Sequence, residues 1–369
     1  MAKFCFVIHP VSFEDVVRYE PGAAGKGRPI VAKILEWMPE YAAAHLTGIR
    51  TPDGRETEGW FVAAPLLPEQ MLELPREEVY ARILRAIDIG VELGAEIAGL
   101  GAFTGVVGDA GVTLAARAPI PVTTGNSLTI AAGVRSLFRG AAEMGIDASV
   151  ATVAVVGATG SIGSACVELI APHVRELIMV ARNETRLRKA HAELARRLPC
   201  ASSYTLDISA AVRRADLVLT ATSSTSDVIE PEDLRTGAVV CELSLPHDVS
   251  RRVALERPDV LVIEGGNMRV PGDLRAQRVR EPDRAFDLNL PRGTLLACMS
   301  ETAVLALENR CESFTLGRGI DIAQVREIER MAANCGFGLA DMRAFDTAIT
   351  REQVAAVRAA AAQRRNLAS

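Results

Sequence analysis

The 369-residue chain has few aromatic residues, no strong excess of charge and no long apolar run. Only 4% of its residues are aromatic, which argues against a surface built to stack single-stranded nucleic acid. With 41 basic and 46 acidic residues the net charge is −5, which does not suggest a general polyanion binder. No stretch approaches the roughly 18 uninterrupted apolar residues of a membrane span, and the run before Pro10 is too short for a signal peptide.

Cysteine and histidine are also too scattered to form a recognisable framework. The seven cysteines include no C-x-x-C pair, and the five histidines form no H-E-x-x-H or zinc-like cluster. An odd number of cysteines in a chain of this length predicts reduced thiols and a cytoplasmic protein. We therefore expect neither disulfides nor a metal site. A G-x-S-x-G nucleophile motif is absent as well.

The composition is that of an ordinary globular protein, with 49% hydrophobic and 24% charged residues, and the length suggests about two domains. From Val153 onward, strands and helices alternate. The expected strands are continuously apolar, which is typical of a parallel sheet covered on both faces; they are residues 153–156, 177–180, 217–221, 239–243 and 260–263. The pattern predicts an α/β protein with a doubly wound, Rossmann-type domain.

The expected organisation has three parts. Residues 1–126 form an N-terminal α/β substrate domain, 127–290 a Rossmann domain with a linker helix, and 291–369 returning C-terminal helices. In the first part, we expect strands at 4–8, 60–64, 97–101 and 120–123, a helix at 77–93, and loops at 22–28 and 52–59. Farther along, we expect helices at 127–144, 294–309, 323–334 and beyond 351.

A glycine-rich turn follows the first strand of the Rossmann pattern. Its glycines are spaced G-x-x-G-x-x-G, and glycine allows a tight turn that approaches a pyrophosphate closely. The N-terminus of the next helix offers unpaired N–H groups to the phosphates. Strand, turn and helix in this order favour dinucleotide binding over a merely structural turn. The predicted contacts are Gly157, Thr159, Gly160, Ser161, Ile162 and Gly163.

The end of the second strand indicates which cofactor binds. An NAD site places Asp or Glu there to accept from the ribose 2′-OH. This chain has Ala181-Arg182-Asn183 instead, and a guanidinium is suited to a 2′-phosphate. We therefore predict that Arg182, assisted by Arg186, binds the 2′-phosphate of NADPH. Alternatively, the two arginines are simply solvated at the start of a helix.

Cys298 is the distinctive candidate for a nucleophile. A cysteine among leucine and methionine on a helix is usually part of the core. On a helix, however, Cys298 shares a face with Glu301 and Thr302, and such a polar stripe can line a cleft. If the helix begins near Gly293, its dipole would modestly favour the thiolate.

The chain resembles the long-chain acyl-[acyl-carrier-protein] reductases, which form aldehydes. This family lies within the shikimate dehydrogenase and glutamyl-tRNA reductase-like group of NADP-binding proteins. The matching segments occur in family order between about residues 85 and 337. They are Gly99-Leu100-Gly101-Ala102-Phe103-Thr104, Thr123-Thr124-Gly125-Asn126, Gly157–Ser164, Ala181-Arg182-Asn183, Gly265-Gly266, Ala297-Cys298-x-x-Glu301 and Phe314-x-x-Gly317-Arg318.

The resemblance implies that Cys298 accepts the acyl group from a long-chain thioester of acyl carrier protein or CoA and that NADPH reduces it to a fatty aldehyde. It implies that Phe103, Thr104, Thr124, Gly125 and Asn126 shape the substrate pocket. For the last three, a strand–turn–helix junction with Asn126 as local cap remains an alternative. Ligands of this architecture gather at the carboxyl ends of the strands, which adds Thr222, Ser223, Gly265 and Gly266 as cofactor contacts.

An acidic carrier protein implies a basic docking patch, and two arginine clusters qualify unless they are simply solvated. They are Arg275, Arg278, Arg280 and Arg284, and Arg186, Arg188 and Lys189. An aldehyde-consuming enzyme is a further candidate partner. Other interpretations are a shikimate dehydrogenase-like or glutamyl-tRNA reductase-like NADP oxidoreductase, since residues 243–249 resemble a loop of the latter, and a non-catalytic NADPH-binding regulator.

Overall fold

The computed structural model describes residues 1–368 and divides them into two compact units. Unit 1 comprises Met1–Leu128, Met268–Ile320 and Arg326–Gly338, and unit 2 comprises Thr129–Asn267, Asp321–Val325 and the residues from Leu339 onward. Residues 268–290, expected in the Rossmann domain, thus belong to unit 1. The expected C-terminal segment, 291–369, is divided between the two units in its described part.

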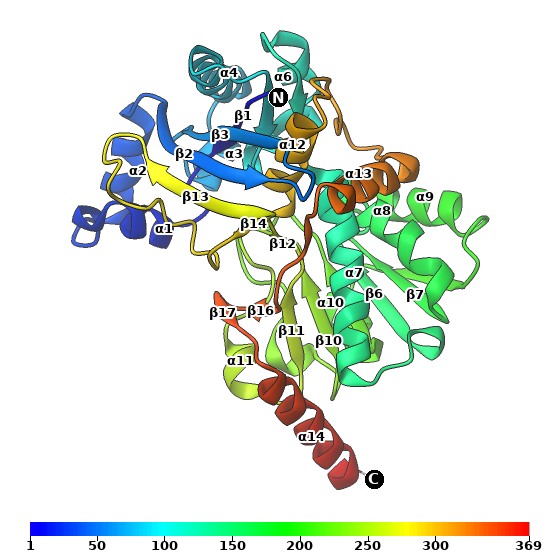
Figure 1. Cartoon of the computed structure of the whole chain (residues 1–369). Coiled ribbons are helices and arrows are strands. Elements are labelled where there is room, and N and C mark those ends of the chain that lie inside the picture. The colour runs from blue at the N-terminus through cyan, green and yellow to red at the C-terminus, as the bar shows by residue number, and fades with distance from the viewer. Residues whose placement is uncertain (369) are drawn as a thin grey trace. The chain divides into compact units, whose positions relative to one another are not determined.

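Unit 1 is built on a six-stranded sheet with the order β13-β2-β3-β1-β4-β5 (Figure 1). Strands β3, β1, β4 and β5 are parallel, whereas β2 and β13 are antiparallel to their neighbours. The elements of this unit are β1 (Phe4–Ile8), α1 (Phe13–Tyr19), α2 (Arg28–Trp37), β2 (Tyr41–Arg50), β3 (Glu56–Ala63), α3 (Pro68–Glu73), α4 (Arg76–Glu92), β4 (Ile97–Leu100), α5 (Val107–Ala110), α6 (Val112–Arg117), β5 (Val122–Thr123), β13 (Gly272–Arg278), β14 (Thr294–Leu296) and α12 (Ala297–Leu307).

Two helices cover opposite faces of this sheet, because successive side chains of a strand point to opposite sides. Cys5 of β1 faces α4, where a Cβ at Gly90 would lie 2.4 Å from the Cys5 sulfur. Phe6 and its register partner Gly99 face α12, where a Cβ at Gly99 would lie 2.2 Å from the Thr302 hydroxyl. Helix α12 is therefore enclosed by protein, which explains why it is apolar on nearly all sides.

Unit 2 contains a parallel sheet with the order β8-β7-β6-β9-β10-β11. This is the 3-2-1-4-5-6 order of a Rossmann domain, with its switch point between β6 and β9. The elements of this unit are β6 (Thr152–Val156), α8 (Ser161–Ile170), β7 (Glu176–Val180), α9 (Glu184–Leu194), β8 (Ala201–Thr205), α10 (Ile208–Arg214), β9 (Leu217–Thr220), β10 (Val239–Glu242), α11 (Arg252–Glu256), β11 (Leu261–Glu264), β16 (Arg343–Ala344), β17 (Thr347–Ala348) and α14 (Arg351–Ala368). The expected α/β fold with a doubly wound parallel sheet is confirmed.

Four elements extend across the boundary between the units: α7 (Asn126–Met144), β12 (Asn267–Arg269), α13 (Ile322–Asn334) and β15 (Gly338–Leu339). Within unit 2, α7 lies close to the sheet because two of its residues lack a side chain. A Cβ at Gly133 would lie 2.5 Å from Leu243, and one at Gly140 would lie 2.4 Å from Ile263. The helix expected at 127–144 is thus confirmed. Gly133 and Gly140 allow it to pack close to the sheet.

Several sequence-based expectations were wrong in detail. Residues 52–59 were expected to be a loop, yet β3 begins at Glu56. Residues 294–309 were expected to be one helix, yet 294–296 form β14 and the helix begins at Ala297. The pattern also missed β2, β8 and β13, whose exposed and half-buried residues interrupt the apolar signal. No helix within residues 1–368 has the length and apolarity needed to cross a membrane.

A buried ion pair joins α4 to the segment that precedes β2. The Arg82 and Glu40 side chains are 4% and 5% exposed, and their closest N–O distance is 2.6 Å. We expect Arg82→Met to lower the free energy of unfolding by about 3–5 kcal/mol, because it leaves a buried carboxylate with one cation fewer. Arg85→Met removes a 56% exposed partner of the same carboxylate and should cost under about 1 kcal/mol. Chemical denaturation measures both, and equal losses would contradict the prediction.

Candidate active site

The candidate active site of unit 1 lies at the carboxyl edge of its parallel strands. Parallel strands end at the same edge of a sheet, so the residues that follow β1, β4 and β5 are brought together. His9 follows β1, Phe103 and Thr104 follow β4, and Thr124 follows β5. The four residues are buried. The predicted substrate residues therefore share one region of unit 1, although they come from different loops.

Cys298 lies in the first turn of α12, in contact with the loop that follows β5. Gly125 has a φ of +72°, and a Cβ there would lie 2.3 Å from the Cys298 Cα and 2.4 Å from its Cβ. Only glycine allows so close an approach of backbone to this cysteine. Leu296, the N-cap of α12, makes no side-chain capping hydrogen bond. The structure thus places Cys298 beside the Thr124-Gly125-Asn126 segment.

The Cys298 thiol is protonated in the free protein. The residue is partly exposed as a whole, but burial of the sulfur raises the pKa of the Cys298 thiol to about 12. The Met299 backbone N–H opposes this increase, whereas the negative charge of Glu301 adds to it. The helix begins at Ala297 and not near Gly293, and its first-turn N–H lowers the thiol pKa as expected, but the loss of solvation is larger.

The Glu301 carboxylate links three segments around Cys298. It accepts hydrogen bonds from the hydroxyls of Thr123 (2.6 Å) and Thr315 (2.8 Å), and from the backbone N–H of Leu128 (2.8 Å). Burial raises the pKa of the Glu301 carboxyl, against the effect of these donors and of the Ser127 backbone. Because Leu128 and Ser127 are in the first turn of α7, Glu301 also caps that helix from outside.

The sequence suggested that the polar stripe of α12 lines a cleft, but most of this stripe is buried. Glu301 and Thr302 are fully buried, and the Thr302 hydroxyl donates to the Cys298 carbonyl oxygen at 3.3 Å. Cys298 alone of the three is partly exposed. Sequence reasoning missed Thr315, which brings the loop after α12 into this network: its carbonyl oxygen accepts from the backbone N–H and the hydroxyl of Thr124.

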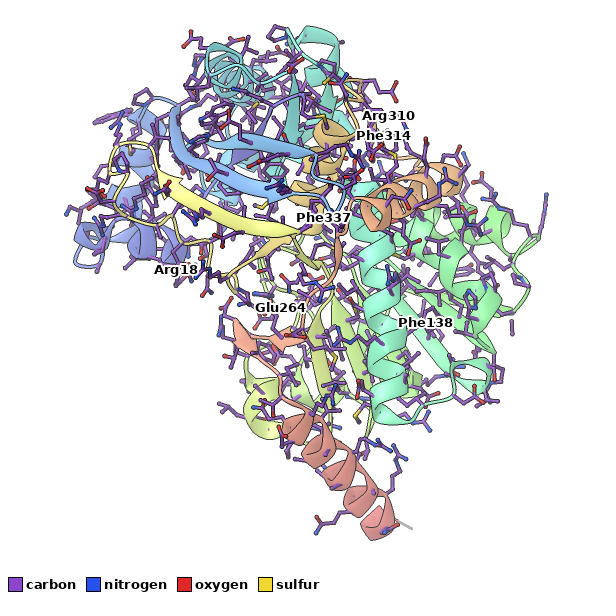
Figure 2. The ribbon with its side chains drawn as sticks, viewed as in Figure 1. Arg18, Phe138, Glu264, Arg310, Phe314 and Phe337 are labelled. Atoms are coloured by element: carbon purple, nitrogen blue, oxygen red, sulfur yellow. The ribbon has the colours of Figure 1, made fainter. Side chains whose placement is uncertain are left out.

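The loop after α12 is fixed by a cation over an aromatic ring. The Arg310 guanidinium lies 5.3 Å from the centre of the Phe314 ring (Figure 2) and pairs with Glu327. Gly317 has a φ of +76° and donates its N–H to the Ala110 carbonyl oxygen. The Phe314-x-x-Gly317 motif thus holds Thr315 in position beside Glu301.

His9 fixes the predicted substrate loop after β4. Its Nε2 accepts from the Phe103 N–H at 3.0 Å, which assigns the proton to Nδ1, and Nδ1 donates to the Pro10 carbonyl oxygen at 2.9 Å. Burial lowers the pKa of His9 to about 4, so the ring is neutral. Thr104 donates its hydroxyl to the Gly101 carbonyl oxygen at 2.8 Å, and the hydroxyl is therefore already engaged within the loop.

Unit 2 contains the glycine turn predicted to bind a dinucleotide. Gly157 has a φ of +89°, and a Cβ there would lie 2.3 Å from the Ala221 carbonyl oxygen at the end of β9. A Cβ at Gly163 would lie 2.3 Å from the Gly157 carbonyl oxygen, so α8 packs directly on the turn. The N-cap Gly160 makes no side-chain capping bond, and Thr159, Ser161 and Ile162 are partly exposed. This geometry suits a pyrophosphate.

No carboxylate stands at the end of β7. Ala181, Arg182 and Asn183 follow the strand, and the Asn183 side chain caps α9 by accepting from the Arg186 N–H at 2.9 Å. Arg182 and Arg186 are exposed, and the contacts of residues 1–368 include no ion pair for either guanidinium. Both cations are therefore available to an anionic ligand.

The other predicted cofactor contacts differ from one another. Thr222 is engaged by Asp248, which accepts from its hydroxyl at 2.5 Å and from its N–H at 3.2 Å. Ser223 is exposed. A Cβ at Gly265 would lie 2.4 Å from the Cys241 sulfur, whereas one at Gly266 would meet no atom within 4 Å. Gly266 and Ser223 thus remain open to a ligand, but Gly265 has a packing role.

Sequence reasoning did not identify a buried polar network in the loop after β10. Asp248 accepts from Thr220, Thr222 and Ser244, and Glu242 accepts from the Asp248 and Val249 N–H groups. Glu242 also binds His247 Nδ1 at 2.8 Å and raises the pKa of that imidazole against the effect of burial. The network could have been suspected from residues 243–249, which the sequence analysis compared only with a loop of glutamyl-tRNA reductase.

His247 also belongs to a charged cluster with Glu264, the last residue of β11, which is labelled in Figure 2. Ligand atoms of His247, Glu264 and Asp346 lie within 4.8 Å of one another, a spacing compatible with a metal ion. Arg343 pairs with Glu264 at 2.9 Å, and Arg251 pairs with Asp346 at 2.6 Å. These arginines already balance both carboxylates, so the cluster is accounted for as an ion-pair network that holds β16 against β11.

Comparison with known proteins gives a family match over part of the chain. Residues 140–264 match the model of the shikimate / quinate 5-dehydrogenase family. Two solved structures are similar to part of the chain. Glutamyl-tRNA reductase from Thermoplasma volcanium is 18% identical, with 36% of this chain and 84% of that chain covered and a TM-score of 0.26. Δ1-pyrroline-2-carboxylate reductase from Thermococcus litoralis is 12% identical, with 32% and 36% covered and a TM-score of 0.27.

Two curated relatives match most of the chain. Aminotransferase PigE from Serratia sp. is 33% identical over 310 residues, which are 83% of this chain. The chain spans only 35% of the length of PigE. Long-chain acyl-[acyl-carrier-protein] reductase from Synechococcus elongatus is 28% identical over 301 residues, covering 78% of this chain and 84% of the relative. The region that matches the family model, residues 140–264, contains the six strands of the Rossmann sheet of unit 2.

The neutral state of buried His9 makes stability depend on pH. Its pKa is about 4 in the folded protein against 6.5 as the ordinary value, so the unfolded chain binds the proton more readily. Stability is complete above pH 6.5 and falls as the pH decreases toward 4, by about 1.4 kcal/mol per unit of pKa difference. His9→Asn should remove this dependence, measured as the urea midpoint at pH 7 and pH 5. An unchanged pH slope in the variant would contradict the assignment.

Proposed function

We propose that this protein reduces a long-chain fatty acyl thioester to a fatty aldehyde with NADPH, through an acyl-enzyme on Cys298. The observation that carries the proposal is the placement of Cys298 in the first turn of α12, in close contact with Gly125. The match to the acyl-[acyl-carrier-protein] reductase supports it, because that match covers most of both chains.

The name of the other relative does not suit the residues of this chain. Aminotransferases hold pyridoxal phosphate as a Schiff base on a lysine, which must lie in the site. The four lysines here are Lys3, Lys26, Lys33 and Lys189, and all have solvent-accessible side chains. Lys3 pairs with Glu58 and Lys33 with Glu36 on the surface. The match to PigE therefore does not argue for transamination by this chain.

A shikimate dehydrogenase-like activity would need a Lys–Asp site. Within the described part of the chain, none of these lysines pairs with an aspartate. A glutamyl-tRNA reductase-like activity would need a nucleophilic cysteine near the N-terminus. Cys5 is the only one there, and it is fully buried in β1 with its pKa raised to about 12. If the protein were a non-catalytic NADPH-binding regulator, the close contact between Gly125 and Cys298 would serve only packing.

The residues of unit 2 fit NADPH. The Gly157–Gly163 turn and the N-terminus of α8 would hold the pyrophosphate, and Arg182 with Arg186 would bind the 2′-phosphate. Bound NADPH supplies the hydride for the reduction. Ala181, Arg182 and Asn183 directly after β7 favour NADPH over NADH, because a carboxylate at the end of this strand would repel the 2′-phosphate.

The first chemical step is an exchange of the acyl group between the donor's thioester and the Cys298 thiol. The Cys298 sulfur attacks the acyl carbonyl carbon, the bond to the donor's sulfur breaks, and the Cys298 proton passes to the departing thiolate. The exchange is nearly balanced because one thiol and one thioester are consumed and one of each is formed. Since Cys298 is stored as a neutral thiol, its proton must leave during the attack and not before.

The second step releases the aldehyde from Cys298. Reduction of the acyl carbon produces a thiohemiacetal on the sulfur, and its C–S bond breaks to give the aldehyde and a thiolate that takes up a proton. The developing oxyanion needs N–H donors. The first turn of α12, which lacks a side-chain cap, offers backbone N–H groups beside Cys298.

The donor is proposed to be acyl carrier protein or CoA. Of the two arginine clusters, Arg275 and Arg284 pair with Asp273 and Glu281, and the Arg278 guanidinium lies 4.4 Å from the Tyr19 ring. The second cluster on α9 is less compensated, since Lys189 pairs with Glu193 only at 3.9 Å. For an acidic carrier protein, α9 is thus the better docking surface.

Incubation with palmitoyl-CoA without NADPH tests the nucleophile. We expect intact mass spectrometry to show one palmitoyl adduct, which disappears when NADPH is added. Cys298→Ser should form no reducible adduct and lose at least about 1,000-fold in aldehyde formation. Cys311→Ser, a change at another partly exposed cysteine of unit 1, should behave as the wild type. A Cys298→Ser protein with full reductase activity would exclude this mechanism.

Arg182→Ala tests the cofactor. We expect the KM for NADPH to rise by roughly tenfold or more, because a charge-assisted hydrogen bond to the 2′-phosphate is lost. The KM for NADH should not change. Arg188→Ala, an equally exposed change on α9, serves as the control. A parallel rise for both nucleotides in Arg182→Ala would contradict the assignment.

A further inference from the structure

Residues 243–249, which follow β10 in unit 2, take no part in the reaction proposed above. Asp248 of this segment is fully buried. Within residues 1–368, the donors to its carboxylate are neutral: the hydroxyls of Thr220, Thr222 and Ser244 and the N–H of Thr222. Burial of a charge costs free energy, and these hydrogen bonds offset that cost. The groups that donate them are held in place in return.

Asp248 holds both ends of the loop that follows β9, residues 221–228. At the start of the loop, its carboxylate accepts from the Thr222 hydroxyl at 2.5 Å and from the Thr222 N–H at 3.2 Å. At the end of the loop, its carbonyl oxygen accepts from the N–H groups of Val228 at 2.8 Å and Ile229 at 3.1 Å. A single buried residue therefore fixes where this loop leaves the sheet and where it returns.

The same loop borders the glycine turn that is proposed to bind the pyrophosphate. A Cβ at Gly157 would lie 2.3 Å from the Ala221 carbonyl oxygen and 3.3 Å from the Thr222 nitrogen. The next four residues, 223–226, all carry hydroxyls, and the Thr222 oxygen orders them by accepting from the Ser224 N–H at 3.0 Å. Ligands of doubly wound sheets bind at this edge, beside the switch point between β6 and β9. The loop thus forms one wall of the dinucleotide site.

We propose that Asp248 is a positioning residue for the nicotinamide dinucleotide, and that it acts through Thr222 by holding the 221–228 loop in its binding conformation. The inference rests on the part of the proposed function in which unit 2 binds NADPH. Asp248 does not touch the cofactor, because its side chain has no exposed surface. A loop that is ordered before binding loses less conformational entropy when the ligand arrives, and the affinity is higher for that reason.

Glu242, the last residue of β10, fixes Asp248 from the side of the sheet. Its carboxylate accepts from the N–H of Asp248 and, at 2.9 Å, from the N–H of Val249. The support of the loop therefore reaches from the end of one strand, through Asp248, to the end of the neighbouring strand β9.

Calorimetric titration with NADPH, without an acyl donor, tests the proposal. We expect Asp248→Ala to raise the Kd for NADPH by at least about tenfold. Asp248→Asn should restore the Kd to within about threefold of the wild type, because its amide oxygen still accepts from the Thr222 N–H. The control is Asp216→Ala, which removes a carboxylate that accepts from the Thr152 N–H at 3.0 Å at the opposite end of β9. It should lower the melting temperature but leave the Kd within about twofold.

A double-mutant cycle tests the route through Thr222 and does not depend on the folding of Asp248→Ala alone. Thr222→Val keeps the shape of the side chain but removes the hydroxyl that bonds Asp248, and we expect it to raise the Kd by about fivefold. The double variant should bind no more weakly than Asp248→Ala, because both changes break the same link. Losses that multiply in the double variant would overturn the route through Thr222.

A Kd that stays within twofold of the wild type in Asp248→Ala or in Thr222→Val would overturn the proposal and leave the network a purely structural role. Equal losses of affinity in Asp216→Ala and Asp248→Ala would overturn it as well. If the wild-type protein bound neither NADPH nor NADH, this inference and the proposed function would both be wrong. The palmitoyl adduct on Cys298 is measured without nucleotide and the Kd without acyl donor, so the proposed nucleophile and the proposed role of Asp248 can each fail alone.

Discussion

One buried carboxylate holds the candidate site of unit 1 together. Glu301 is enclosed by neutral donors from the end of β5, the first turn of α7 and the loop after α12. A carboxylate in such surroundings is costly unless its oxygens are hydrogen-bonded, and here both oxygens accept. Removing any one of these segments would deprive the buried carboxylate of one of its donors. The positions of Thr124 and Gly125 beside Cys298 therefore depend on Glu301.

Close approach of backbone to side chain recurs in both units. Gly125 allows the β5 loop to contact Cys298, and Gly99 makes room for Thr302 of α12. In unit 2, Gly157 brings the phosphate-binding turn against the end of β9. In each place a Cβ would lie within 2.4 Å of a neighbouring atom, far closer than the non-bonded contacts that Cβ atoms make. Glycine thus sets the spacing of the two proposed sites, while hydrogen bonds fix their orientation.

The Rossmann half was predictable because its strands are continuously apolar and its turn has the glycine spacing that a pyrophosphate requires. Residues 294–296 were assigned to a helix because Thr-Leu-Leu continues the apolar periodicity, whereas they extend as β14. The role of Glu301 was hidden for a different reason. Its partners Thr123 and Thr315 lie 178 and 14 residues away along the chain, and no local pattern indicates which donors surround a carboxylate.

The protonated state of Cys298 has a consequence for oxidative damage. Peroxides attack thiolates, and a thiol whose pKa is about 12 is almost entirely uncharged at neutral pH. The resting protein should therefore resist conversion of Cys298 to the sulfenic acid, unlike cysteine enzymes that keep a permanent thiolate. In the proposed reaction the sulfur would carry its charge only briefly, so sensitivity to oxidants would be confined to turnover, and burial would protect the thiol at other times.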